Sequence, residues 1–508
     1  MSNGLNKLII PIIVIIAAGI GAYFVFQKPA FFEPQKEPTT SQEQINKDSP
    51  FGMHGAFSRP FFTDNISPQE GARMFSEVKE PYSHVLDIGA RWIRLSSDIY
   101  WSTVQPTKEY VDNGLYDWSF FDALHGRAPS GVNTLGTISV GKERTKNNTW
   151  EFINKEVEEK YLEFVKKVVE RYDGDGIDDM PGLKNPIKYW QIENEPAVYY
   201  EPRFDWQGFS HLVEITYKVI KENDPESNVA LGGLAGGNAV NNFNDPFYPL
   251  FLKQLNDFYF PILKSLKDKN IYLDIFDIHY YSGDLRWPQN KWEDNWEDMK
   301  DIYNIIRKNL DENGYKNTEI WITETATMEK INGEKAQAAS LVKRYVYPLS
   351  FGVKKVFWWN MIEGEYPLEV DKPANHLGLV YDGIGKDDPG YGVKKLAYYT
   401  YKKMIEILEG SDWDNIQAIQ ESDGVYIYKF VKDSKPIWIV WNDNSAEKQI
   451  TISGITSSQV KITEAVPKYE SGVDVKDYSA AFNIETKSVQ NGKVIITLKD
   501  IPVFIEEK

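Results

Sequence analysis

Eight short runs of β-branched and aromatic residues alternate with longer stretches of helical periodicity from Phe51 onward. The eight runs are FGMHGAF, RWIRLSS, VNTLGTISV, IKYWQIE, NVALGGL, IYLDIFDIHYY, TEIWITE and KKVFWWN. The stretches between them, such as WEDMKDIYNIIRKNLDENG, repeat apolar residues every three or four positions, which is the spacing of one helix face. Strands that alternate with helices form parallel βαβ units. Eight such units predict an α/β fold, a (β/α)8 TIM barrel over residues 51–411.

The competing architecture is an open, doubly wound sheet. Such a sheet usually carries a glycine-rich phosphate-binding turn after its first strand, and the first strand–helix turn here lacks one. The barrel is therefore favoured. Beyond it, residues 412–508 contain short alternating runs such as GVYIYKFV and KPIWIVWND with turn residues between them. This pattern predicts a small C-terminal antiparallel β-sandwich as an accessory domain.

The N-terminus predicts a membrane anchor over residues 1–27. The run Leu8–Phe26 is uncharged and close to the ~20 residues that span a bilayer, whereas the apolar part of a secretory signal is shorter. Residues 28–50 are rich in Pro, Gln, Glu, Ser and Thr and predict a flexible linker. The lysines that flank the apolar run nearly balance, so charge barely decides its orientation. We expect a single-pass anchor with an extracytoplasmic catalytic domain, mainly from the function argued below; a secreted protein is the alternative.

Composition excludes several functional classes. The net charge of −17 argues against a nucleic-acid partner, which would need a basic face. The chain has no cysteine, so disulfides, thiolate metal sites and a cysteine nucleophile are excluded. Its oligomeric state cannot be predicted from these features.

Carboxylates fall where a barrel places its chemistry, at the C-terminal ends of the strands. Glu193, Asn194 and Glu195 end the fourth strand-like run, and Glu324 ends the seventh. Each glutamate alone is more simply explained as a surface residue. As a pair at one barrel mouth, with the Asn and Pro beside Glu195, they match the two carboxylates of retaining glycoside hydrolysis.

The motifs NEP (194–196) and ITE (322–324), on the fourth and seventh of eight ordered strands, resemble those of the (β/α)8 clan A of retaining glycoside hydrolases, closest to families 39 and 5. The resemblance covers the barrel, and it implies hydrolysis of glycosidic bonds, β-linked in most such enzymes, in a poly- or oligosaccharide. It implies that Glu195 is the acid/base and Glu324 the nucleophile. Glu193, just before the motif, departs from relatives that have a small or aromatic residue there. It either points away from the site or adds charge to it.

The same resemblance implies substrate-binding residues. Asn194 would bond the sugar 2-hydroxyl, and Arg94, in RWIRLSS at the end of the second strand, would contact the nucleophile and keep it ionised. In DIHYYSG, Tyr281 would orient the nucleophile; His279 has a weaker claim, because a strand histidine is often simply packed.

A tryptophan at the end of the eighth run would form the floor of the sugar site. Since side chains alternate along a strand, only one of Trp358 and Trp359 should face the barrel mouth, and we favour Trp359. Loop aromatics, namely Trp101, Tyr199, Trp206 and Trp287, are further candidates for stacking on sugars.

No cofactor is expected for catalysis. The stretch YDGDGIDDMPG has the order D-x-D-G-x-x-D over Asp173–Asp179, which resembles calcium-binding loops. A structural Ca²⁺ and a solvated acidic turn are the alternatives there, and both lie at the bottom face of the barrel, away from the site.

The sequence thus predicts a membrane-tethered retaining glycosidase with a carbohydrate substrate. One rival is a non-catalytic carbohydrate-binding surface protein, although the intact Glu195 and Glu324 count against it. The other is a metal-dependent hydrolase, which would need a cluster of ligands that the six scattered histidines do not indicate.

Overall fold

The computed structural model describes residues 48–56, 67–95, 97–141, 155–197, 204–235, 252–281, 296–364, 376–385 and 387–508. All of them belong to one compact unit, Ile45–Lys508. The predicted anchor and all but the last three residues of the predicted linker lie outside the described residues. Within the described part of the chain, no helix has both the length and the apolar character needed to cross a membrane.

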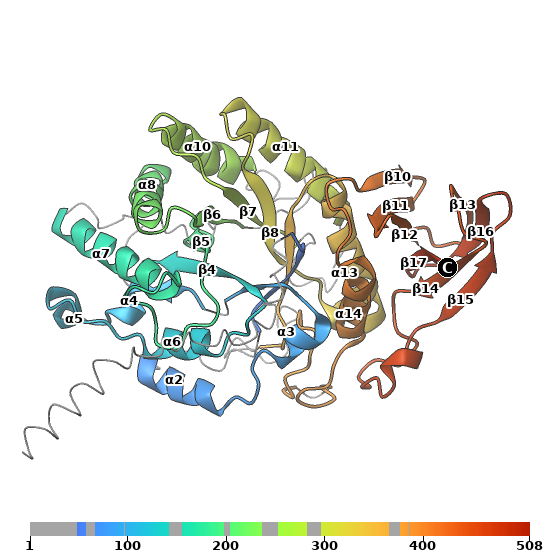
Figure 1. Ribbon diagram of the computed structural model, residues 1–508, viewed down its shortest axis with the longest axis horizontal. Coiled ribbons are helices and arrows are strands. Elements are labelled where there is room, and N and C mark those ends of the chain that lie inside the picture. The colour runs from blue at the N-terminus through green and yellow to red at the C-terminus, as the bar shows by residue number, and fades with distance from the viewer. Residues whose placement is uncertain are drawn as a thin grey trace, which may run out of the picture. The chain divides into compact units, whose positions relative to one another are not determined.

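Eight parallel strands close into a barrel, as predicted (Figure 1). They are β1 (Phe51–His54), β2 (Trp92–Arg94), β4 (Asn133–Ser139), β5 (Tyr189–Ile192), β6 (Asn228–Leu234), β7 (Ile275–His279), β8 (Glu319–Thr325) and β9 (Lys355–Trp359). The order β2-β1-β9-β8-β7-β6-β5-β4 is closed by pairing between β2 and β4. A two-residue strand, β3 (Ile99–Tyr100), extends β4. Each predicted run therefore contains one barrel strand, and the fourth and seventh barrel strands are β5 and β8.

Helices cover the outside of the strands (Figure 1). Their bounds are α2 (Pro68–Glu77), α3 (Ser83–Ile88), α4 (Trp101–Val104), α5 (Lys108–Asp112), α6 (Ser119–Gly126), α7 (Lys155–Tyr172), α8 (Trp206–Asn223), α10 (Phe260–Lys267), α11 (Met299–Glu312), α12 (Glu329–Asn332), α13 (Glu334–Ser350) and α14 (Leu396–Leu408). Short non-α turns are η3 (Leu255–Tyr259), η4 (Trp296–Asp298) and η6 (Tyr478–Ala480). Local sequence fixes the helix ends; Asp205, for example, caps α8 by accepting a hydrogen bond from the Gly208 N–H at 2.6 Å.

Large aromatic side chains fill the barrel near the N-terminal ends of its strands. Trp92 packs edge-on against Trp321 with ring centroids 5.0 Å apart, and Phe357 lies against both. Gly52 makes room for this plug, because a Cβ there would lie 2.6 Å from the Phe357 ring. Since this end is filled, a substrate can reach the barrel only at the C-terminal ends of the strands.

The C-terminal part is antiparallel, as predicted. Its strands are β10 (Gln417–Ser422), β11 (Val425–Lys432), β12 (Lys435–Asn442), β13 (Lys448–Ser453), β14 (Gln459–Glu464), β15 (Ile484–Ser488), β16 (Lys493–Leu498) and β17 (Val503–Glu507). Six form one sheet in the order β10-β11-β12-β17-β14-β15, and β13 pairs with β16. Residues of both sheets share one apolar cluster. The predicted domain boundary at 411/412 falls between α14 and β10 and, like the sandwich, stays a prediction.

Candidate active site

Glu324 lies near the end of β8 in a ring of three polar side chains. The Arg94 guanidinium donates to its Oε1 at 2.5 Å, and the Tyr281 hydroxyl donates to its Oε2 at 2.6 Å. His54 Nδ1 lies 3.1 Å from the same Oε1. These partners come from β2, the segment after β7, and β1, so strands distant in sequence converge on one carboxylate.

Electrostatics keep Glu324 ionised. Burial by itself would raise the pKa of the Glu324 carboxyl, but its interactions with His279, His54 and Arg94 outweigh burial and hold this pKa well below its usual range. For Tyr281, burial and the charge of Glu324 raise the phenol pKa well above its ordinary value. Tyr281 therefore stays a neutral donor to an anionic Glu324.

Glu195 lies in the turn after β5, with its side chain 23% exposed against 10% for Glu324. Its Oε1 lies 2.7 Å from His279 Nδ1. One carboxylate oxygen of Glu195, one of Glu324 and one ring nitrogen of His279 all lie within 4.8 Å of one another. The fold therefore brings the two predicted catalytic carboxylates together beside the same nitrogen of a buried histidine.

His279 is fully buried at the end of β7 between these groups. Its Nε2 lies 3.4 Å from Asp277 Oδ2, and its Nδ1 is 3.5 Å from Glu324 Oε2. Burial lowers the pKa of the imidazole, but the charge of Glu324 and the contacts with Asp277 and Glu195 raise it to about 10. Gly233 leaves space for the ring, since a Cβ there would lie 2.3 Å from Nε2. His279 thus contacts both carboxylates of the site rather than packing inertly.

Asn194 is linked to Glu324 through Arg94. The guanidinium Nη2 donates to Asn194 Oδ1 at 2.6 Å while Nη1 donates to Glu324. Arg94 is 1% exposed, so it acts as an internal strut between β5 and β8 rather than as a surface ion pair.

The Glu193 carboxylate bonds to the end of β4. Its carboxylate accepts hydrogen bonds from Ser139 Oγ at 2.7 Å and from the Val140 N–H at 2.6 Å, and it is fully buried. The backbone here is unusual, because Glu193 and Glu195 have positive φ angles of 61° and 46°. Left-handed conformations cost non-glycine residues roughly 1–2 kcal/mol each, so the surroundings must hold this turn in place.

The two tryptophans of β9 face opposite sides. Trp359 is half-buried, and its ring meets Tyr281 edge-on with centroids 6.1 Å apart; the Trp359–Asn360 peptide bond is cis. Trp358 is fully buried, and its Nε1 donates to the Leu377 carbonyl at 3.0 Å. The structure therefore corrects the inclusion of Trp358 among substrate-binding residues: a side chain closed off from solvent cannot stack on a sugar.

The described loop aromatics differ in how far they are buried. Trp101 is buried and its Nε1 donates to Gln105 Oε1 at 2.7 Å, so its expected role as a sugar platform was wrong. Trp206 begins α8 and is half-buried. Tyr199 and Trp287 lie outside the described residues.

His54 was missed as a site residue. The reading of the six histidines as scattered was also wrong, because His54 and His279 both approach Glu324. A signal was present in the sequence, because His54 is a polar residue inside the first predicted strand. The structure ends β1 at His54 and pairs it in register with Arg94 on β2.

Four clusters of described residues bring metal-ligating atoms together: Glu195 with His279 and Glu324; Asp173 with Asp175 and Asp179; Glu329 with Glu363 and His376; and Glu363 with Asp382 and Asp388. In the first, Arg94 already provides a cation beside Glu324. In the third, the buried Lys395 contacts both glutamates. The second lies in the predicted acidic loop between α7 and β5, where Asp179 also accepts from the Gly174 and Gly176 N–H groups. A Ca²⁺ ion there stays a prediction.

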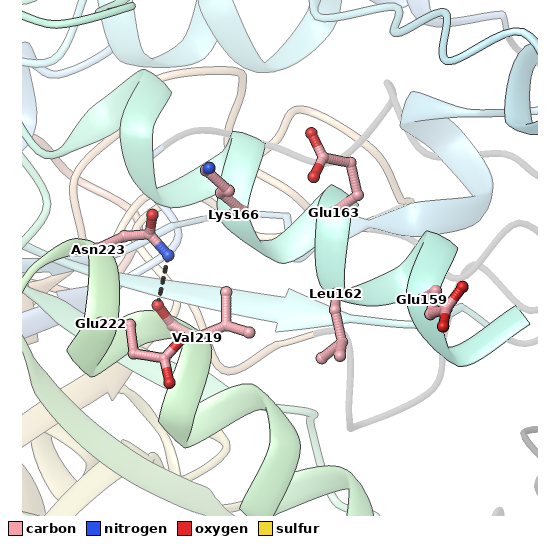
Figure 2. Close-up of a pocket in the computed structure, with 7 residues that line it drawn as sticks. All are labelled: Glu159, Leu162, Glu163, Lys166, Val219, Glu222 and Asn223. Carbon is pink, nitrogen blue, oxygen red and sulfur yellow. Dashed lines mark hydrogen bonds between the residues drawn. The ribbon is translucent and has the colours of Figure 1, made fainter. Parts of the chain in front are cut away.

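A pocket on the outer surface lies apart from these groups (Figure 2). It lies between α7 and α8 and is lined by Glu159, Leu162, Glu163, Lys166, Val219, Glu222 and Asn223. None of the strand-end residues lines it. The candidate active site is therefore the cluster around Glu195 and Glu324.

Comparison with known proteins supports the fold. No protein-family model matches the sequence, and no curated protein matches it. Among solved structures, a family 39 glycoside hydrolase from Bacteroides cellulosilyticus WH2 is 16% identical, with a TM-score of 0.56 over 90% of this chain and 81% of that chain. A family 51 α-L-arabinofuranosidase from Bifidobacterium longum is 11% identical, with a TM-score of 0.58 over 91% and 96%. A monomeric β-xylosidase from Caulobacter crescentus CB15 is 12% identical, with a TM-score of 0.55 over 90% and 96%. The chain therefore shares its fold with clan A glycoside hydrolases, and the resemblance predicted from its sequence is confirmed at that level.

Proposed function

We propose that this protein is a retaining glycoside hydrolase in which Glu324 is the nucleophile and Glu195 the acid/base. The observation that carries the proposal is the proximity of the two carboxylates at the barrel mouth, since one oxygen of Glu195 lies within 4.8 Å of one oxygen of Glu324. Retaining enzymes hold their carboxyl groups about 5–5.5 Å apart, whereas inverting enzymes need about 6.5–9.5 Å to admit a water molecule.

The first step would be attack by Glu324 on the anomeric carbon. Arg94 and Tyr281 keep the attacking carboxylate ionised and oriented. As the bond from the sugar to its leaving group breaks, Glu195 protonates the leaving oxygen. Since His279 engages Glu195 Oε1, we assign the transferable proton to Oε2. The products of this step are the released alcohol and a glycosyl ester on Glu324.

The second step would reverse these roles. After the first step Glu195 is a carboxylate, because it has given its proton to the leaving oxygen. Glu195 then accepts a proton from water as the water oxygen bonds to the anomeric carbon. The ester bond to Glu324 breaks, the Glu324 carboxylate is restored, and the sugar leaves with its original configuration.

The substrate class follows less directly from the fold. Its neighbours include a β-xylosidase and an α-L-arabinofuranosidase, so the fold does not select a linkage. We propose a poly- or oligosaccharide, β-linked as the resemblance to clan A implies, with Trp359 as the sugar floor and Asn194 bonding the 2-hydroxyl. The anchor at residues 1–27 would hold the enzyme at the outer surface of a membrane.

The test is hydrolysis of a panel of aryl glycosides and polysaccharides by the full chain, with the product anomer followed by NMR. Glu324→Gln should abolish turnover, and the first-formed product of the native protein should keep the configuration of the substrate. Glu319→Gln is the matched control, since Glu319 is an exposed glutamate at the opposite end of the same strand. Inversion of configuration, or undiminished turnover by Glu324→Gln, would refute the mechanism. Glycan binding without turnover would favour the carbohydrate-binding alternative.

A further inference from the structure

Glu193 ends a strand that leads directly into the catalytic motif, yet the proposed chemistry leaves it without a role. Its carboxylate is fully buried and bonds to the end of β4. Burying a carboxylate is costly unless its oxygens are bonded. A residue kept at such a position therefore needs a physical reason.

That reason lies in two donors that converge on Glu193. The Val140 N–H reaches Oε1 and the Ser139 hydroxyl reaches Oε2, at 2.6 and 2.7 Å. Both donor residues are fully buried, so a small or aromatic side chain at 193 would leave them without these acceptors. The Glu193 N–H in turn donates to the Ile138 carbonyl at 2.9 Å. The end of β5 is thus bonded to the end of β4 through both the backbone and the side chain of one residue.

The neighbouring strand β6 holds the same turn from its other side. A Cβ on Gly232 would lie 2.5 Å from the Ile192 carbonyl oxygen and 2.7 Å from that of Glu193, so β6 approaches the turn more closely than any side chain would permit. The Gln191 side chain also donates to the Glu193 carbonyl at 2.9 Å. These contacts surround the strand-end turn, Glu193–Glu195, in which the first and last residues have positive φ.

We infer that Glu193 is a positioning residue: its buried carboxylate holds the strand-end turn in the left-handed conformation that presents Glu195 to the leaving group. This inference rests on the proposed function. It adds that the hydrogen-bonded carboxylate of Glu193 fixes the position of the acid/base, Glu195, two residues later. A displacement of about 1 Å at a reacting group can cost about 100-fold in rate, so a loss of these bonds should be measurable.

The inference is tested with aryl glycosides of the sugar that the native full chain hydrolyses, chosen to span leaving groups from poor to strongly activated. Poor leaving groups need protonation by Glu195, whereas activated ones leave without it. Glu193→Ala should lower kcat/KM about 100-fold for poor leaving groups and much less for activated ones. Glu193→Gln keeps an acceptor for the Val140 N–H and should recover most of the loss.

Two further variants separate positioning from general damage. Glu334→Ala is the control, because Glu334 is also a buried carboxylate, bonded to the Tyr381 hydroxyl and to the Leu396 and Gly472 N–H groups. It should lower the unfolding temperature without changing the dependence on the leaving group. If Glu193→Ala does not fold, Ser139→Ala, which removes one of the two donors, should give the same pattern with about a tenfold loss for poor leaving groups.

Each other outcome overturns the inference. An equal loss for all leaving groups in the Glu193 and Ser139 variants would mean that they only destabilise the barrel, as would a pattern matching that of Glu334→Ala. Unchanged kinetics would mean that the strand-end turn keeps its conformation without the Glu193 carboxylate. Failure of the proposed function is read separately, from the native protein and Glu324→Gln; a native chain that hydrolyses no glycoside would remove both.

Discussion

Replacing Arg94 with methionine should move the acidic limb of the pH–rate profile upward. Arg94 and Glu324 are both buried, and their nearest N and O atoms are 2.5 Å apart, which puts the centres of charge about 4 Å apart. At an effective dielectric constant of about 20, two unit charges at that distance attract by about 4 kcal/mol. Because one pH unit corresponds to about 1.36 kcal/mol, full loss of this attraction would shift the limb by about three pH units. His54 and His279 still face Glu324 in the variant, so we expect a shift of about one to three pH units.

The sign follows from the role of Glu324. Its carboxyl pKa is held low, so the native nucleophile stays ionised as the pH falls through the mildly acidic range. Without Arg94, protonation occurs at higher pH, and kcat/KM falls off earlier on the acidic side. The assay is kcat/KM against pH with a good aryl glycoside substrate. Arg171→Met is the control, because Arg171 forms an ion pair of the same 2.5 Å length with Asp122 away from the site. An unchanged acidic limb in a folded Arg94→Met protein would refute the electrostatic role assigned to Arg94.

Three further predictions test other contacts. Tyr281→Phe removes a hydrogen bond to a charged group and should lower kcat about 10- to 100-fold with KM little changed; a raised KM at unchanged kcat would count against it. Gly233→Ala drives a methyl group into His279 and should abolish activity, whereas Gly126→Ala, with 3.6 Å of clearance, should be neutral; equal activity of the two would contradict the packing. Burial lowers the pKa of His125 to about 3, so stability is lost as the pH falls from about 6.5 toward 3. Between pH 7 and pH 5 this effect lowers the free energy of unfolding by about 2 kcal/mol, and His125→Leu should remove that decrease in urea unfolding experiments. The same pH dependence in both proteins would show that His125 is already charged in the fold.

The order of the strands along the chain could be predicted because local residue patterns specify each strand. A run such as NVALGGL, with turn residues on both sides, specifies a buried strand without knowledge of its neighbours, and β6 occupies that run. Likewise, α11, Met299–Glu312, forms within the stretch WEDMKDIYNIIRKNLDENG, whose apolar spacing predicted a helix. The places of Glu195 and Glu324 at one barrel mouth followed in the same way, since each ends a strand of a parallel barrel.

Side-chain direction was harder to predict. Trp101 was expected in a sugar cleft but packs in the core. The preference for Trp359 over Trp358 followed from alternation along a strand, yet only the hydrogen bond from Trp358 to Leu377 shows that the buried member is fixed inside. Alternation tells that two neighbours face opposite ways, and the helices and loops packed around the strand decide which way is inward.

The sequence by itself determined the barrel and the strand-end position of both carboxylates, and its resemblance to clan A indicated the Arg and the Tyr that meet Glu324. Only the tertiary structure decided the partners that link strands far apart in the chain. His54 and His279 converge on Glu324 from β1 and β7, and Glu193 bonds to the end of β4. The physical reason is that local sequence sets which residues form a strand and which ends it. Barrel closure sets which strand ends become neighbours, and hydrogen bonds, burial and charge arise only between such neighbours.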